Sequence, residues 1–181
     1  MLSAKKFVTK NRRKLLLLGE FIVKFNLLAI PMYAVLLSGM QLQPLQSVTT
    51  DAVYAVFKIL GYAAERNGTT ISFGSPLYTD IVIDTDCTAW KSMYAYAALV
   101  LATPFAIGWG KKSKLILIGV LALFALNAVR IVSTVAVAVA FGAGWLDVVH
   151  TVLWREGMIL AVVAFWFLAV QGGAGRPKSK K

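Results

Sequence analysis

Long apolar segments separated by basic ones restrict the fold of this 181-residue chain more than any other feature. Four segments stand out, at about 15–39, 88–109, 115–141 and 148–170. Each has the roughly 20 residues that a helix needs to cross the hydrocarbon core of a bilayer. Hydrophobic residues make up 59% of the chain, which excludes an ordinary soluble domain. We therefore expect an α-helical integral membrane protein with a bundle of four transmembrane helices.

The distribution of basic residues predicts how these helices are oriented. Thirteen of the 19 lysines and arginines lie in residues 5–14, 111–114 and 176–181, which flank the apolar segments on one side. By the positive-inside rule this side is cytoplasmic. We expect a multi-pass cell-membrane protein with two cytoplasmic ends, and its net charge of +11 favours lipid headgroups over nucleic acid as partners.

The expected domain organisation follows from the same pattern. A membrane-embedded domain at 15–171 is predicted between basic cytoplasmic tails at 1–14 and 172–181. The first apolar segment also has the basic start of a signal peptide. It is long, however, carries Glu20 and Lys24 as an i,i+4 pair, and lacks a clear small-residue cleavage site. We interpret this segment as a retained anchor.

Residues 40–86 form the longer of two loops expected on the outer side. Within 48–60, apolar residues recur at helical spacing opposite polar ones, which predicts an amphipathic helix on the membrane or the bundle. An Asn-Gly pair at 67–68 is a turn signal. Near it, 69–73 and 78–85 are predicted to pair as a small β-hairpin, whose second strand leads to the only cysteine of the chain.

That cysteine, Cys87, lies where the outer loop meets the second apolar segment. A single cysteine forms no internal disulfide, so it is either a buried packing residue or a reactive thiol. A free thiol titrates near ~8.5, and a nucleophile needs nearby positive charge. Lys91, one helical turn further on, is a candidate, with a salt bridge to Asp86 as the alternative. Asp84 and Asp86 would oppose activation if they lie close to the thiol.

Arg130 lies inside the third apolar segment, where a charge is costly and usually serves a pathway or a site. Asn127, Ser133 and Thr134 lie on the same helix face. Arg130 is a candidate to stabilise a thiolate or an oxyanion, with Asn127 as a second donor. The alternative is a polar seam that holds helices together.

His150, the only histidine, opens the fourth apolar segment. It is a candidate to accept the thiol proton and later protonate a leaving amine, and the alternative is a hydrogen-bonded histidine at the membrane interface. Asp147 either orients this histidine or caps the fourth helix. One histidine and one cysteine cannot form a zinc site alone, so no metal is expected.

The predicted topology places Cys87, Arg130 and His150 in the same leaflet, but their depths differ. Phe141, the last residue of its apolar segment, lies eleven positions after Arg130, which corresponds to ~16 Å of helix. The three groups meet only if that helix ends early or if the site lies below the membrane surface.

The sequence resembles the exosortase/archaeosortase family of membrane transpeptidase-like enzymes, over about Val48 to Leu168. Three separated patterns carry the resemblance: Asp86-Cys87-Thr88-Ala89-Trp90-Lys91-Ser92, Asn127-Ala128-Val129-Arg130, and His150. The form of the cysteine motif leans toward archaeal members. The chain is short for this family, whose larger members have additional membrane helices.

The resemblance implies that Cys87 attacks a peptide bond of a membrane-anchored substrate, with Arg130 and His150 completing the site. Such substrates end in a sorting signal, which is a short motif, a transmembrane helix and a basic tail. The acyl group would pass through a thioester to an acceptor, a lipid in the archaeal case, without a cofactor. The alternatives are a non-catalytic membrane scaffold or transporter subunit, and an inactive member that only binds sorting signals.

Overall fold

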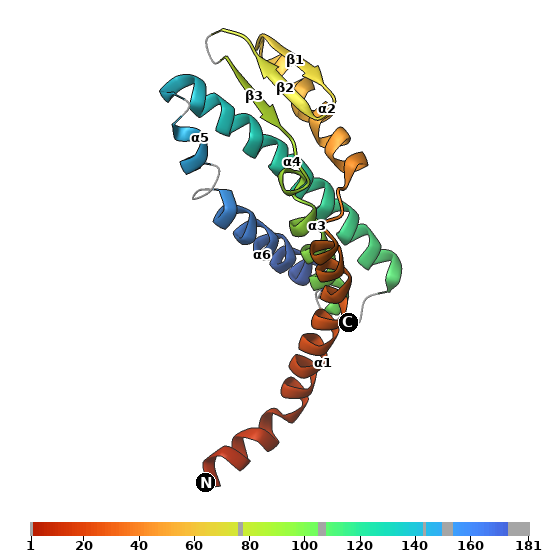
Figure 1. The fold of residues 1–181 in the computed structure, drawn as a ribbon. Helices are drawn as coiled ribbons and strands as arrows, with labels where there is room; N and C mark the ends of the chain where they lie inside the picture. The colour runs from red at the N-terminus through yellow and green to blue at the C-terminus, as the bar shows by residue number, and fades with distance from the viewer. Residues whose placement is uncertain (1, 76–77, 105–107, 143, 150–153, 174–181) are drawn as a thin grey trace, which may run out of the picture.

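The computed structural model describes residues 2–75, 78–104, 108–142, 144–149 and 154–173 and is mostly helical (Figure 1). The helices are α1 (Leu2–Ser38), α2 (Gln43–Ile59), the short 3₁₀ turn η1 (Asp86–Thr88), α3 (Trp90–Ala102), α4 (Trp109–Phe141), α5 (Trp145–Val148) and α6 (Trp154–Gly173). The strands are β1 (Ala64–Asn67), β2 (Thr70–Phe73) and β3 (Thr79–Val82). The sheet lies at one end of the molecule, and α1 begins at the other.

The described helices only partly match the four predicted membrane spans. The part of α1 from Asn11 and the whole of α4 are long and apolar enough to cross a bilayer, whereas the apolar part of α6 is shorter. The span predicted at 88–109 is wrong in length. Its helix α3 has 13 residues, or ~20 Å, against a hydrocarbon core of ~30 Å. Because the residue before a proline avoids the helical region, α3 ends before Pro104.

The other predicted boundaries also shift. Helix α4 begins at Trp109 rather than 115, because the lysines before its apolar part continue the same helix. Helix α6 is described from Trp154, and the predicted start of the fourth span at 148 is followed by residues 150–153, which lie outside the described part of the chain. In the N-terminal tail predicted at 1–14, α1 already begins at Leu2. The predicted pair of Glu20 and Lys24 is confirmed as an ion pair.

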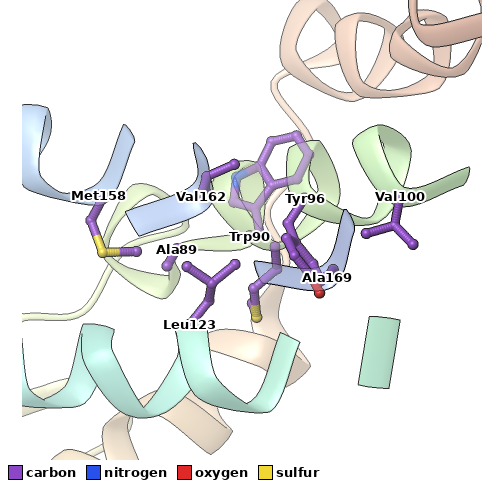
Figure 2. Packing of buried hydrophobic residues seen from close by; sticks show 9 residues of the cluster. Ala89, Trp90, Tyr96, Val100, Leu123, Met158, Val162 and Ala169 are labelled. Atoms are coloured by element: carbon purple, nitrogen blue, oxygen red, sulfur yellow. The ribbon is translucent and has the colours of Figure 1, made fainter. Parts of the chain in front are cut away.

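The first of two hydrophobic cores is the helix bundle, formed by α1, α3, α6 and the first half of α4. Helix α3 packs against the other three helices. Figure 2 shows its core, in which Tyr96, Leu123 and Met158 come from three different helices. Tyr96 lies against Gly119 of α4, where an added Cβ would be 2.2 Å from the ring. Gly119 therefore allows α3 and α4 to approach closely.

The second core is the sheet unit, formed by α2, the three strands and the second half of α4. The amphipathic helix predicted at 48–60 is confirmed as part of α2, which buries Val53 and Phe57. Ile71 of β2 and Val135 of α4 complete the contact between sheet and helices. This core lies at the end of the molecule where the sheet is drawn in yellow (Figure 1).

The predicted hairpin supplies two strands of a three-stranded antiparallel sheet with the order β1-β2-β3. The pairing of β2 with β3 is confirmed, with Ile71 opposite Ile81. The prediction missed β1, and the Asn-Gly turn at 67–68 joins β1 to β2. Gly68 has a φ of 61° there. The sequence of β1, Ala-Glu-Arg-Asn, has no β-branched or alternating pattern, so its strand conformation comes from pairing with β2.

Helix α4 belongs to both cores. Its 33 residues extend over ~50 Å, well beyond the ~30 Å of a hydrocarbon core. Leu123 packs in the helix bundle, and Ile131 and Val135 pack in the sheet unit. Asn127 and Arg130 therefore lie where α4 passes from one core to the other.

Candidate active site

Cys87 lies in the short segment that connects the sheet to the helix bundle. After β3, the buried Ile83 anchors the chain in the sheet unit, and η1 follows. Ala89 then has a φ of 57°, in the left-handed region. A residue with a Cβ pays roughly 1 kcal/mol or more in this region, and such strain is often found at functional sites. The turn sends the chain into α3 and leaves Cys87 against α4.

A polar network fastens this segment to the start of α2. The Thr85 hydroxyl donates to Gln41 Oε1 at 2.8 Å and accepts from Gln46 Nε2 at 2.8 Å. The backbone N–H of Leu42 also donates to this hydroxyl, at 3.2 Å. Thr88 donates to the Thr85 carbonyl at 2.7 Å. Because Thr85, Thr88 and Gln46 are buried, these bonds fix the backbone on both sides of Cys87.

Asn127 joins the cysteine segment to α4. Its Nδ2 donates to the backbone carbonyl of Cys87 at 2.7 Å, and its side chain is fully buried. The buried Arg130 donates from its guanidinium to Asn127 Oδ1 at 3.4 Å. The Arg130 carbonyl accepts from the hydroxyls of Ser133 and Thr134, so these two hydroxyls are bonded within their own helix. The structure thus brings together Cys87, Asn127 and Arg130.

The position of this contact along α4 bears on the first of the two conditions stated for the sequence, which is that the helix ends early. Helix α4 does not end early, since it continues to Phe141. Cys87 instead meets it at Asn127, about 18 Å along the helix from Leu115 and about 21 Å before Phe141. The cysteine segment therefore contacts the middle of α4 rather than its end.

Asp84 has a second role at the site. From the sequence it was expected only as a negative charge that opposes activation of the thiol. Its Oδ1 accepts the backbone N–H of Cys87 at 2.8 Å. Burial and then the Asp84 carboxylate raise the pKa of the Cys87 thiol to about 11, whereas the charge of Arg130 acts to lower it. The thiol is consequently protonated at neutral pH. An aspartate three residues before the thiol, where it can accept a turn N–H, is the signal that was available in the sequence.

Lys91 is paired away from the thiol. Its Nζ lies 2.7 Å from Asp86 Oδ1, which is the alternative that the sequence left open. Arg66, in β1, is also paired elsewhere, with its Nη1 3.1 Å from Asp51 Oδ1. Arg130 is therefore the cation that acts on Cys87 in the described part of the chain.

Two predicted site residues are not placed against Cys87. His150 lies outside the described residues, so its predicted role as the base is not addressed by the structure. Asp147 lies inside α5 rather than at the start of α6, and its side chain also lies outside the description.

A pocket of about 250 Å³ lies beside the cysteine segment, between it and the end of α1. Its charged walls are Asp84, Asp86 and Lys91, and α1 contributes Val35 and Leu36. Among the described residues, no three histidine, cysteine or carboxylate side chains are grouped closely enough to bind a metal ion. The site offers a thiol, a carboxylate and a guanidinium. Of these the Asp84 carboxylate lines the pocket, whereas Cys87 and Arg130 are not among its lining residues.

Comparison with known proteins identifies the family. A model of the transmembrane exosortases (Exosortase_EpsH) matches residues 11–170. The chain belongs to the exosortase family. It is thus an exosortase-family membrane protein, and members of the family are in general cysteine transpeptidases. A search of curated proteins and a search of solved structures each gave no match.

Proposed function

We propose that this chain is a membrane cysteine transpeptidase that cleaves C-terminal sorting signals of exported proteins. Cys87 is the nucleophile, and the acyl group is passed through a thioester to an acceptor, for which a lipid is the candidate. The sheet unit faces the outer side of the cell membrane, and both ends of the chain are cytoplasmic. The beginning of α1 and the end of α6, which lie away from the sheet, support this orientation (Figure 1).

One observation carries the proposal. The only cysteine of an exosortase-family chain is bound through its own carbonyl to Asn127, beside the buried Arg130. A buried cation within a membrane helix is costly, and a site that uses its charge accounts for that cost. A reaction that develops negative charge on sulfur and then on a carbonyl oxygen uses it directly.

The chemistry follows from these positions. The thiol of Cys87 loses its proton to a base, for which His150 is the candidate, and the thiolate sulfur attacks the scissile carbonyl carbon. Arg130 stabilises the resulting oxyanion. The C–N bond breaks, the leaving amine takes the proton, and a thioester remains until the acceptor attacks it. Asn127 is a positioning residue, because its amide is engaged with the Cys87 carbonyl.

The depth of the site fits a substrate that is itself held in the membrane. Helix α3 extends only ~20 Å from Cys87 toward the side of its C-terminus, so the thiol would lie below the outer surface of a ~30 Å hydrocarbon core. A scissile bond next to a transmembrane helix reaches this depth without leaving the bilayer.

The test uses co-expression with a reporter that ends in a sorting signal from the same genome. Cys87→Ala, Arg130→Ala and His150→Ala should each lower processing by more than about a hundredfold while the enzyme still inserts. Arg66→Ala is the matched control for loss of an arginine, because Arg66 pairs with Asp51 in the sheet unit. Normal processing by Cys87→Ala would refute the proposal.

The same variants separate the alternatives. An inactive member would bind the reporter without cleaving it, so the wild type would be co-purified with an intact reporter. A scaffold or transporter subunit would neither bind nor cleave it, and its thiol would be unreactive toward a membrane-impermeant maleimide.

A further inference from the structure

Strand β3 is an edge strand that leads directly into the cysteine segment. The order of the sheet is β1-β2-β3, and among the described residues no strand pairs with the other edge of β3. Four residues separate its last residue, Val82, from Cys87. Val82 is 59% exposed and Asp80 is also exposed. A free edge of this kind is a template for pairing with another extended chain.

The backbone groups available on this edge follow from the register. The N–H of Ile83 donates to the Thr69 carbonyl at 2.8 Å, so Ile83 and, two residues earlier, Ile81 direct their backbone groups toward β2. The residues between them alternate. The carbonyl of Asp80 and the N–H of Val82 therefore point away from β2, and they have the spacing that binds one residue of a neighbouring parallel strand.

We propose that the free edge of β3 binds the extended segment of the substrate that precedes its scissile bond, by parallel strand addition. This inference rests on the proposed function and describes how the site binds its substrate. The occupant is an extended polypeptide because the edge offers backbone donors and acceptors. These groups bind the backbone of an extended chain, whatever its side chains are.

The direction of pairing follows from where β3 leads. The strand runs from the tip of the sheet unit toward η1 and the middle of α4 (Figure 1). A substrate anchored by a helix on the C-terminal side of its motif also runs toward the membrane. The substrate segment and β3 are thus parallel, and a substrate segment paired with β3 leads to the thiol. The pocket of about 250 Å³ begins at Asp84, where the strand extension ends.

The opposite edge serves as an internal comparison. The N–H of Gly74 donates to the Ala63 carbonyl at 2.9 Å, so by the same alternation Arg66 of β1 directs its backbone away from β2. Strand β1 packs against α2 and does not lead to Cys87. Its edge should play no part in substrate binding.

Proline substitutions test the proposal in the membrane-inserted enzyme. Val82→Pro removes an N–H that β2 does not use, and an edge strand tolerates this change. We expect about tenfold lower processing of the reporter at limiting concentration, whereas Val82→Ala, which keeps the N–H, should lose no more than about threefold. Arg66→Pro is the matched control on the opposite edge and should process normally. Unchanged processing by Val82→Pro, or equal losses in Val82→Pro and Val82→Ala, would overturn the proposal.

Cross-linking tests binding apart from chemistry. In a Cys87→Ala background, which is otherwise free of cysteine, Val82→Cys should form a disulfide with single cysteines placed along the reporter segment before the motif. Parallel pairing predicts cross-links at every second reporter position, and Glu65→Cys on β1 should form none. Cross-links at β3 with no processing by the wild type would refute the proposed function alone. Processing by the wild type without cross-links at β3, or with equal cross-links at β1, would refute strand addition alone.

Discussion

The helix bundle and the sheet unit share α4 but are stabilised in different ways. In the bundle, helices approach closely at Gly119, and buried polar groups pair between helices, as Trp166 does with Thr103 at 2.9 Å. The sheet unit instead has an aromatic cluster, in which the rings of Phe57 and Phe73 are 4.8 Å apart and perpendicular. Large apolar side chains remain exposed along the bundle helices. Lipid gives no hydrophobic driving force between helices, whereas water around the sheet unit, in the orientation proposed above, would give one.

This difference explains where the candidate site lies. Cys87 enters from the sheet unit, and its carbonyl is bound by Asn127 at the position where α4 changes partners. A site at this boundary has a polar segment on one side and apolar helices on the other. The two cores can therefore be perturbed separately, and the site should respond to both.

The largest expected effect separates the two driving forces. Phe57→Ala removes a fully buried ring from the sheet unit and should cost about 3–5 kcal/mol of stability. Leu123→Ala, equally buried in the bundle, should cost less than half as much, because packing alone is lost in an apolar surrounding. Hydrogen exchange in lipid nanodiscs would report each core. Equal losses in the two cores would show that one driving force stabilises both.

The next effect tests the close approach of α3 and α4. Gly119→Ala places a methyl group against the Tyr96 ring, and we expect a loss of about 1–3 kcal/mol from overpacking. Gly110→Ala, in the same helix with open space around it, is the matched control and should not destabilise. Thermal unfolding of the two variants in detergent is the measurement. Equal melting temperatures would show that the helices separate without cost.

The third prediction concerns the bond between the cores. Asn127→Ala leaves the part-buried carbonyl of Cys87 without its donor, at a cost of about 1–3 kcal/mol. Alkylation of Cys87 should become faster because its segment is released from α4. Ser133→Ala, which removes a hydroxyl bonded within its own helix, is the control and should change neither stability nor alkylation appreciably. An unchanged alkylation rate in Asn127→Ala would contradict the coupling.

The smallest effect concerns the charge balance at the thiol. Since the thiolate reacts and the pKa of Cys87 is about 11, alkylation should rise about tenfold per pH unit between about pH 7 and 10. Asp84→Asn removes a group that raises this pKa, so labelling at pH 8 should become several-fold faster. Arg130→Gln removes a group that lowers it and should slow labelling. A stopped-flow pH profile measures all three, and a shift of the profile in the opposite direction would exclude the assigned electrostatics.

Local patterns in the sequence were sufficient for several features. Helical spacing found the amphipathic part of α2, and alternation found the pairing of β2 with β3. The cysteine motif and the motif around Arg130 were sufficient to indicate the family, which the family model then confirmed. These features depend on side chains a few residues apart, so their signal is local.

Other features had no local signal. Strand β1 is extended only because β2 pairs with it. The shortness of α3 was missed because apolar residues continue in the sequence beyond its C-terminal end. Asp84 was expected only as an opposing charge, since nothing local showed that it binds the N–H of Cys87.

The sequence by itself determined that this is an exosortase-like membrane protein with one thiol between a polar segment and an apolar helix. Composition and charge suffice for the membrane character, because transfer into lipid depends on each segment separately. The position of the site along α4 was decided only by the tertiary structure. Cys87 and Asn127 are 40 residues apart, and their contact exists because α4 extends through both cores while the segment after β3 passes its middle before the left-handed turn at Ala89 leads into α3.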